Sequence, residues 1–500
     1  MKLNIFKIPK DSISDLKLKF ESVGLEVIHS STHGRWKTNF YFSKDIDSKK
    51  IPWVEEYADL FSNDRPKNLI YFAAYLWESD NCCFAISYGK SHFYIRQHCD
   101  HDFGTEIAKR VVNKEDVRQK STKKFAGKKK KEIRSYTKNT KLDIESGESV
   151  DYLQASILEE QKDNFGKTGK FGSSVSLNPE IEREQLEDFL DNLTKLAESK
   201  ELFVLPRTMI IDGLPETVSY EEKLIKEVKG IKDSADFTAN SHDLVGVDFV
   251  FSGQEKYVFY WKGNPSEELD ELSIEQLKGF ISEYSIPDDQ ILNIKVKVKK
   301  EDANEFSRTL KESIDYIVDG QNVILSQGRW MRFNEDYLDQ LDEYINSIDL
   351  EKVEDNFIEI SGTEGDFNTE LKKHGYDVAD KDFSKIKVKS GTLVEAWDIK
   401  KDDTVYAVKF GTAQKLGYVC DQASNTLELI SKKANTKKLD QTFGIYCIWI
   451  GIENKTIPTK VSEINSVILK QKIESWARKC LELGITPKIK ISKHSKSSER

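Results

Sequence analysis

Three short strand-like runs near the end of the chain decide the fold: 386–389 (IKVK), 392–399 (TLVEAWDI) and 404–410 (TVYAVKF). Each run is rich in β-branched or apolar residues, and glycine or polar residues separate it from the next, which is the pattern of a β-meander. A polar helix is expected just before the runs, near 368–374, and a longer helix just after them, over 413–432.

The chain continues with a strongly apolar strand over 442–452 (TFGIYCIWIGI), a helix over 460–483 and a last strand over 486–492 (TPKIKIS). Written in order, these elements are α-β-β-β-α-β, followed by α-β. This order resembles the core of restriction-endonuclease-like proteins, in which a β-meander presents acids and a lysine to one metal site. We therefore predict a nuclease-like α/β domain over 350–500.

Hydrolysis of a phosphodiester at neutral pH needs carboxylates that hold Mg²⁺ or Mn²⁺, together with a lysine near the attacking water. Nucleases of this fold carry an Asp on the second strand, and an acid followed two residues later by a lysine on the third. Lys409 stands at the lysine position, whereas Ala407 stands where the acid is expected. Because a neighbouring strand can supply the missing carboxylate, we predict that Glu395, Asp398 and Asp380 hold the metal.

Alternation along a strand directs Glu395 and Asp398 to opposite faces unless a bulge intervenes, so the composition of the site stays open. Asp382 is an alternative to Asp380. The plainer interpretation is also open: Lys409 is then an ordinary lysine at the end of a strand, and Glu395 is a solvated residue on a half-buried sheet.

Gln414 and Tyr418 follow Lys409 at the start of the next helix. Residues four apart lie on one helical face, so both side chains are predicted to point toward the lysine and to position the phosphate. The spacing resembles a motif of RecB-type nucleases, although a Gln and a Tyr four residues apart also recur by chance.

Five hundred residues exceed what one core usually organises, so we predict a multidomain α+β and α/β protein. An N-terminal α+β domain is expected over 1–117 and a middle α+β domain over 176–349, where Asp319-Gly320 predicts a tight hairpin turn. The six cysteines show no CxxC pair, no signal peptide is recognisable, and no window reaches 18 apolar residues. A cytoplasmic location is the default expectation.

A basic segment separates these two domains, although the formal net charge of the chain is −9. Between 118 and 141 eleven cations face a single acid, Glu132, so we predict an exposed arm or linker over 118–175 that binds a phosphate backbone. A solvated linker without a ligand is the alternative. The predicted nucleic-acid-binding residues are Lys123, Lys124, Lys128, Lys129, Lys130, Lys131 and Arg134.

Two other motifs are weaker candidates for chemistry. The run 97–102 (QHCDHD) concentrates metal-ligand residue types, but its place before a helix favours capping over metal binding. The GKT at 166–168 lacks the preceding glycine and the apolar strand of a phosphate loop.

Several diffuse motifs resemble a sporadically distributed bacterial family of unknown function that is found near restriction and phage-defence genes. These motifs are LNIFKI (3–8), CCFAISYGKSHFYI (82–95), DFGTEIAKRVV (102–112), FGSSVSLN (171–178), GRWMRFNEDYLDQL (328–341), LVEAWDI (393–399) and VYAVKFG (405–411). The resemblance implies a bacterial, cytoplasmic protein that acts against invading nucleic acid. It places Glu395, Asp398 and Lys409 at the family's Glu, Asp and Val-Lys positions, whereas Gln414 and Tyr418 depart from its more apolar pattern.

The resulting hypothesis is a defence protein that binds nucleic acid, DNA before RNA, and cleaves it by metal-dependent hydrolysis. The first alternative is a catalytically inactive nuclease fold that binds DNA or a phage protein. The second is a toxin-like ribonuclease. The sequence leaves open whether the protein is an enzyme, whether it needs a phage or defence partner protein, and whether it forms an oligomer; it gives no indication of a membrane partner.

Overall fold

A computed structural model describes residues 1–44, 47–61, 65–125, 131–137, 140–229, 247–249, 256–269, 272–300, 303–318, 320–378, 386–387, 393–394, 397–411, 413–431, 443–453 and 456–495. The chain divides into two compact units. The first contains 1–123, 131–144 and 148–207, and the second contains 124–130, 145–147 and 208–500. The protein is a multidomain α+β structure. No described helix has the length and hydropathy that crossing a membrane requires.

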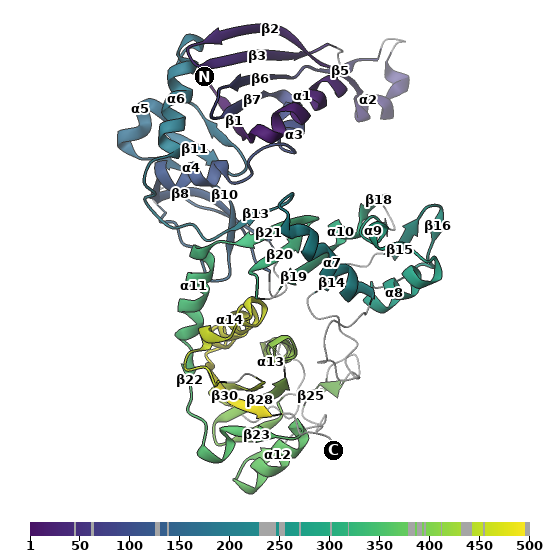
Figure 1. Ribbon diagram of the computed structural model, residues 1–500, viewed down its shortest axis with the longest axis vertical. Helices are drawn as coiled ribbons and strands as arrows, with labels where there is room; N and C mark the ends of the chain where they lie inside the picture. Colours follow the sequence, from purple (N-terminus) through teal and green to yellow (C-terminus); the bar gives the residue numbers. More distant parts are fainter. Residues whose placement is uncertain are drawn as a thin grey trace. The chain divides into compact units, whose positions relative to one another are not determined.

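The first unit is built on a ten-stranded sheet in the order β2-β3-β6-β7-β1-β12-β11-β10-β8-β9 (Figure 1). Its strands are β1 (Leu3–Ile8), β2 (Leu25–His33), β3 (Trp36–Ser43), β6 (Ala73–Glu78), β7 (Cys83–Tyr88), β8 (Val112–Lys123), β9 (Lys131–Ser135), β10 (Ser149–Ile157), β11 (Thr168–Phe171) and β12 (Val175–Leu177). A separate ribbon pairs β4 (Asp47–Lys50) with β5 (Lys67–Ile70). The helices are α1 (Ile13–Ser22), α2 (Pro52–Glu56), α3 (His92–Ile95), α4 (Phe103–Val111), α5 (Lys162–Phe165) and α6 (Leu186–Ala197).

Helices cover both faces of this sheet, which explains why its central strands β6 and β7 are apolar on both sides. On one face, Phe6 of β1 packs with Leu16 and Phe20 of α1. On the other face, Ile5 of β1 packs with Ile107 of α4 and with residues of α6. Alternate residues of one strand therefore enter two separate cores.

The expected basic arm is wrong for the described residues between 118 and 175. They contribute strands β8 to β12 to the large sheet, together with the helix α5, and are not an exposed linker. The physical reason is a buried ion pair: Lys120 Nζ lies 2.8 Å from Glu148 Oε2, and the two side chains are 1% and 0% exposed. Glu148, which is 28 residues away in the chain, neutralises the positive charge of Lys120, which the mostly basic sequence around it leaves uncompensated.

The second unit begins with two sheets, of order β13-β21-β20-β19-β14 and β16-β15-β17-β18. The strands are β13 (Thr208–Ile210), β14 (Val247–Phe249), β15 (Lys256–Trp261), β16 (Asn264–Pro265), β17 (Lys295–Lys300), β18 (Ala303–Thr309), β19 (Ile314–Val318), β20 (Val323–Ser326) and β21 (Arg329–Phe333). The helices are α7 (Glu216–Lys229), α8 (Ile274–Glu283), α9 (Asp288–Ile291), α10 (Leu310–Ser313) and α11 (Glu335–Asn346). The predicted hairpin is confirmed, since Tyr316 pairs with Leu325 and Gly320 has φ +78°.

The C-terminal part of this unit is a seven-stranded sheet in the order β24-β27-β28-β29-β30-β22, with β23 also pairing β30. Its strands are β22 (Asp349–Leu350), β23 (Glu359–Ser361), β24 (Asp377–Val378), β27 (Ile399–Lys401), β28 (Thr404–Gly411), β29 (Ile445–Ile452) and β30 (Thr486–Ser495). The helices are α12 (Glu364–Lys373), α13 (Ala413–Ser431) and α14 (Val467–Glu482). β28, β29 and β30 run parallel, whereas β27 is antiparallel to both of its neighbours.

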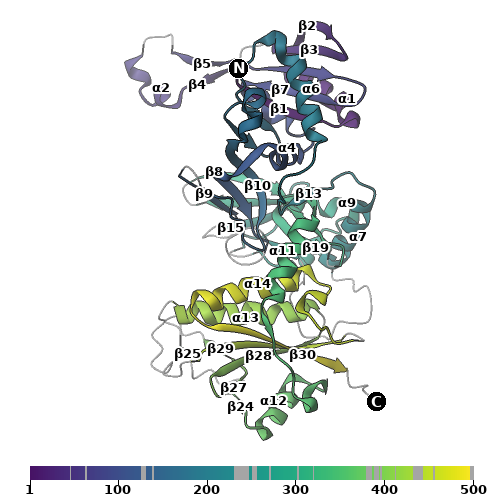
Figure 2. The same ribbon diagram turned by 90° about the vertical axis from the view of Figure 1, so that its left-hand side faces the viewer.

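Different helices pack against the two faces of this sheet. Val405 of β28 and Ile448 of β29 pack with α13 and α14, whereas Val408 and Trp449 pack with Phe367 of α12. Figures 1 and 2 show α13 and α14 on one side of the sheet and α12 on the other. The result is a three-layer α/β/α arrangement.

The prediction for the start of the meander is wrong. Residues of the two runs 386–389 and 392–399 form a separate ribbon, β25 (Ile386–Lys387) paired with β26 (Leu393–Val394). The two strands that precede β28 in the meander are instead β24 and the short β27, which begins immediately after Asp398. Alternation identified strand-forming residues, but it could not tell which partner each strand would choose.

Candidate active site at the carboxyl ends of the parallel strands

The carboxyl ends of β28, β29 and β30 lie at one edge of the C-terminal sheet, because these three strands are parallel neighbours. Ligands of open α/β sheets bind at this kind of edge. The amino end of α12 reaches the same place, since the Glu364 side chain contacts the end of β28. This edge is therefore where the predicted site residues are to be sought.

Glu364 is fixed by the start of α12. Thr363 caps the helix by accepting the Asp366 N–H, and the Asp366 carboxylate accepts the Thr363 N–H in return, which is a capping box. Glu364 is the first residue of the helix, and its side chain reaches β28. There Oε2 lies 2.8 Å from Lys409 Nζ, and Oε1 accepts the Phe410 N–H at 3.1 Å.

Asp398 holds the same edge of β28 from the other neighbouring segment. Its N–H donates to the Tyr406 carbonyl at 3.0 Å, and its carboxylate accepts the Val408 N–H. Because β27 spans only Ile399–Lys401, the edge of β28 beyond it has no strand partner on that side among the described residues. The N–H groups of Val408 and Phe410 therefore donate to two carboxylates in place of a β-ladder.

The two carboxylates and the lysine are partly accessible. The side chains of Lys409 and Glu364 are 31% and 32% exposed. Burial is the main cause that raises the pKa of Tyr446 far above its ordinary range, and the negative charge of Asp398 adds to it. Asp398 therefore lies between the edge of the sheet and its core.

The chain matches a family described as a family of unknown function (DUF6119) over residues 10–443. It belongs to this family. Neither the curated proteins nor the solved structures contain a match. The family match includes Glu364, Asp398 and Lys409 and ends before β29.

Of the residues predicted for the site in this member of the DUF6119 family, Asp398 and Lys409 come to the same strand edge. Glu395 and Asp380 lie outside the described residues. Gln414 and Tyr418 belong to α13, whose backbone begins two residues after β28, but their side chains lie outside the description. The structure thus leaves their predicted roles as predictions.

Glu364 is the acid that the sequence reasoning missed. The signal was present, because Thr363 and Asp366 at capping-box spacing mark a helix start and an acid follows the cap directly. What the sequence could not provide is the distance between Glu364 and Lys409, which are 45 residues apart in the chain.

Carboxylates are the hard oxygen ligands that Mg²⁺ prefers, and a protein commonly provides only one or two of them for this ion. Glu364 and Asp398 fit that requirement in number and chemistry. Within the described part of the chain, no group of three or more His, Cys, Asp or Glu side chains is placed to hold a metal.

The predicted nucleic-acid-binding cations have different surroundings. Lys123 Nζ lies 3.2 Å from Asp151, Lys124 Nζ lies 3.1 Å from Glu145, and Arg134 pairs with Glu132 at 2.8 Å. Lys131 is exposed on β9. Lys128, Lys129 and Lys130 lie outside the described residues.

The cluster at 97–102 has a structural explanation. Asp102 pairs with the buried Arg207, and Asp100 accepts the Asp102 N–H and lies 3.6 Å from Lys7 Nζ. Burial raises the pKa of Asp102 to about 6, against the opposing effect of Arg207. These contacts give the acids of the run structural partners in a loop, but helix capping is not among them, because Asp102 stands at the N-cap of α4 without a side-chain capping hydrogen bond.

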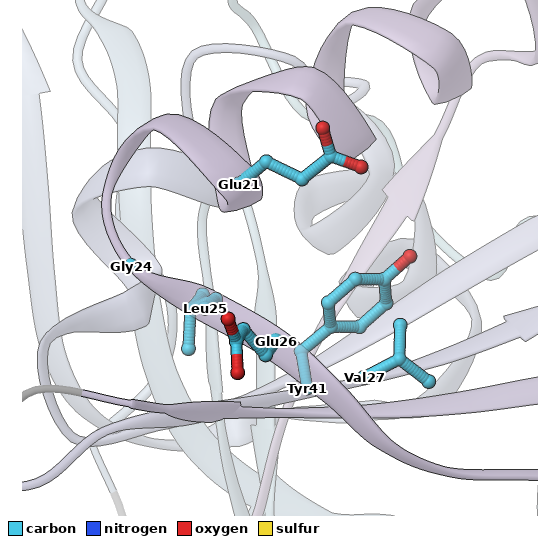
Figure 3. Close-up of a pocket in the computed structure, with 6 residues that line it drawn as sticks. All are labelled: Glu21, Gly24, Leu25, Glu26, Val27 and Tyr41. Carbon is cyan, nitrogen blue, oxygen red and sulfur yellow. The ribbon is translucent and has the colours of Figure 1, made fainter.

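A pocket beside β2 lies elsewhere and contains none of the predicted site residues. It is lined by Glu21, Gly24, Leu25, Glu26, Val27 and Tyr41 (Figure 3). Burial and, less strongly, Glu21 raise the pKa of Tyr41. Its lining holds two carboxylates and no cation, which disfavours a phosphate ligand.

Proposed function

We propose that the C-terminal part of this protein is a nuclease-like domain that acts on nucleic acid, DNA before RNA, at the edge held by Glu364, Asp398 and Lys409. The observation that carries the proposal is that the edge of β28 binds two carboxylates: Glu364, from the helix before the meander, meets Lys409 Nζ and the Phe410 N–H, and Asp398, just before β27, accepts the Val408 N–H.

The order of the elements supports the same proposal. The helix α12 is followed by β24, by β27 and β28 after the separate β25–β26 ribbon, by α13 and β29, and by α14 and β30, and the strands of the large sheet lie side by side in that order. An α-β-β-β-α-β succession with an antiparallel second strand is the arrangement expected of a restriction-endonuclease-like core. The proposal that this is such a core rests on topology and on the three side chains.

The proposed roles follow from charge and position. Lys409 binds a non-bridging oxygen of the scissile phosphate and orients the attacking water, while Glu364 fixes the ammonium group. Glu364 and Asp398 are the residues that would hold Mg²⁺ or Mn²⁺, and the ion would neutralise charge on the phosphate. Glu395, Asp380, Gln414 and Tyr418 remain proposed further members of the site.

A second candidate, a protein that binds nucleic acid without cutting it, is favoured by the surroundings of Ala407. This residue stands at the usual position of an acid, is 3% exposed, and packs in the core cluster that contains Val405 and Leu416. A carboxylate introduced there would be buried among apolar side chains at a cost of several kcal/mol, roughly. β28 therefore provides no acid at the usual catalytic position, and cutting would depend on acids from outside this strand. A protein that only binds nucleic acid does not need such an acid.

The experiment that separates the two is cleavage of end-labelled duplex DNA, single-stranded DNA and RNA with Mg²⁺ or Mn²⁺. The variants are Lys409→Ala and Glu364→Gln. Lys373→Ala and Glu370→Gln are matched controls, because this exposed pair lies on the same helix α12. Cutting that is lost in the first two variants and kept in the controls supports the proposal. Binding without cutting in any condition supports the second candidate, and neither binding nor cutting refutes both.

We propose that the basic segment of the chain adds non-specific affinity for the phosphate backbone through Lys123, Lys124, Lys128, Lys129, Lys130, Lys131 and Arg134. Cations that already have carboxylate partners gain less from a phosphate than exposed ones, so Lys131 is expected to contribute more than Lys123. Removing a cation that contacts a phosphate lowers the slope of log Kd against log salt by about one. An unchanged slope in Lys131→Ala would exclude this residue.

The proposed biological setting is defence of a bacterium against phage or plasmid DNA in the cytoplasm, and it rests on the family resemblance alone. Its test is the plating efficiency of a phage panel on cells that carry the wild-type gene or Lys409→Ala. Protection that requires Lys409 is the expected result. Equal plating on all strains would contradict a role in defence.

A further inference from the structure

His494, near the end of β30, is a nearly buried titratable side chain beside the proposed site. Its ring is 10% exposed. Nε2 lies 3.0 Å from the Gly362 carbonyl oxygen. Since a carbonyl only accepts hydrogen bonds, Nε2 carries a proton in this contact. Nδ1 has no hydrogen-bond partner among the described residues.

Both contacts of this ring lead to Glu364. Gly362 lies two residues before Glu364 and has φ +92°, a conformation that glycine adopts without strain. On the other side, the imidazole stacks on the Phe410 ring, with centroids 5.1 Å apart and planes at 27°. The N–H of Phe410 in turn donates to Glu364 Oε1. His494 therefore contacts the two segments that hold the Glu364 carboxylate in place.

The third neighbour of the ring is Glu453, which directly follows β29 and whose Oε1 lies 3.8 Å from Nδ1. This carboxylate faces the nitrogen of the His494 ring that has no hydrogen bond to a described residue. The imidazole of His494, on β30, thus contacts residues at the ends of β28 and β29 and the turn that precedes α12. A buried polar atom without a partner costs roughly 1–3 kcal/mol, so a purely structural role would be served better by an apolar ring.

We propose that His494 is a positioning residue for the Glu364–Lys409 pair. Its Nε2–H holds the turn that leads into α12, and its ring packs against Phe410, so that the Glu364 carboxylate meets both the Phe410 N–H and Lys409 Nζ. What the pair acts on rests on the proposed function. The positioning itself does not, because it concerns the distance between two side chains of this chain.

The test uses substitutions that separate the hydrogen bond from the volume of the ring. His494→Phe keeps an aromatic ring on Phe410 and removes the donor, whereas His494→Gln keeps an N–H donor at a similar reach. His494→Asn is a second polar variant that is too short to reach Gly362, and it serves if His494→Phe does not fold. The control is His374→Phe, because His374 lies next to the carboxyl end of α12, packs on Phe357 and is far more exposed.

The first readout is the rate of Lys409 acetylation by acetic anhydride, measured by peptide mass spectrometry relative to Lys373. Release of an ion pair of this exposure increases the reactivity of its lysine by about two- to five-fold. We expect that increase in Glu364→Gln, in His494→Phe and in His494→Asn, and not in His494→Gln or His374→Phe. If Glu364→Gln increases the rate while His494→Phe and His494→Asn leave it at the wild-type value, the proposal is overturned.

The second readout is the pair of kinetic constants kcat and KM, measured for the cleavage reaction. Positioning predicts that His494→Phe lowers kcat with KM little changed and that His494→Gln restores kcat, whereas a loss of fold would reduce both variants together. If the wild-type protein cuts none of the substrates, the proposed function fails, and the acetylation rates still decide the role of His494.

Discussion

Replacement of Lys120 by Met should destabilise the N-terminal unit strongly. Lys120 lies on β8 with its ammonium group 2.8 Å from Glu148 Oε2 and also donates to the Asp143 carbonyl, and Thr122 Oγ1 donates to the other carboxylate oxygen at 3.1 Å. The side chains of the ion pair are 1% and 0% exposed. With the lysine removed, the carboxylate of Glu148 stays buried and loses its ammonium partner, although the Thr122 hydroxyl still donates to it.

The magnitude follows from that asymmetry. Breaking a buried pair by removing one partner costs about 3–5 kcal/mol, because it leaves an uncompensated charge, whereas replacing both partners by apolar residues is often nearly neutral. We therefore expect Lys120→Met to lower the free energy of unfolding by about 3–5 kcal/mol. The double variant with Glu148→Leu should recover at least about 2 kcal/mol of that loss.

A chain with two compact units does not unfold in one step, so the assay must report on one unit alone. Hydrogen exchange measured by mass spectrometry on peptides from β8 and β10 gives the free energy of opening for that part of the sheet. A loss below about 1 kcal/mol in Lys120→Met would refute the reasoning, because it would mean that this lysine is solvated, as an exposed basic arm requires.

Three further outcomes are expected. Burial raises the pKa of Glu227 to about 7, although Tyr316 donates a hydrogen bond to its carboxylate. Between about pH 4.5 and 7 the folded state therefore binds more protons than the unfolded state, and the protein loses stability as the pH rises. In denaturant titrations, Glu227→Gln should increase the free energy of unfolding by roughly 1–3 kcal/mol at pH 8 and leave it unchanged below pH 4. Gly104→Ala should cost about 2 kcal/mol or more in thermal unfolding, because its Cβ would lie 2.3 Å from two backbone carbonyl oxygens. Burial raises the pKa of Cys83 to about 12, so iodoacetamide at pH 8 should label this thiol only after unfolding, and rapid labelling of the native protein would show that β7 is open.

The later half of the C-terminal domain was predictable from local pattern. The helix expected over 413–432 is Ala413–Ser431, and the apolar strand expected over 442–452 is Ile445–Ile452. Long apolar strands that alternate with amphipathic helices leave one parallel solution, because each helix must return over the sheet. The ribbon of β25 and β26 was not predictable in this way, since short strands choose partners through contacts that the sequence does not display.

The site was predictable only in its local part. Lys409 and Asp398 were found because the meander places the second and third strands next to each other. Glu364 and His494 were missed because they reach the site from elements distant in the sequence. The basic arm was misinterpreted for the same reason, since the acid that permits the burial of Lys120 lies on the far side of the hairpin.

The most direct test of the central claim is Mn²⁺ binding measured by the loss of the free-ion electron paramagnetic resonance signal, with and without a short duplex DNA. The account predicts one bound ion whose affinity falls about ten-fold or more in Asp398→Asn and Glu364→Gln and is unchanged in Glu370→Gln. Equal Mn²⁺ uptake by all four proteins would contradict the claim that Glu364 and Asp398 form a metal-dependent site on this edge of the sheet.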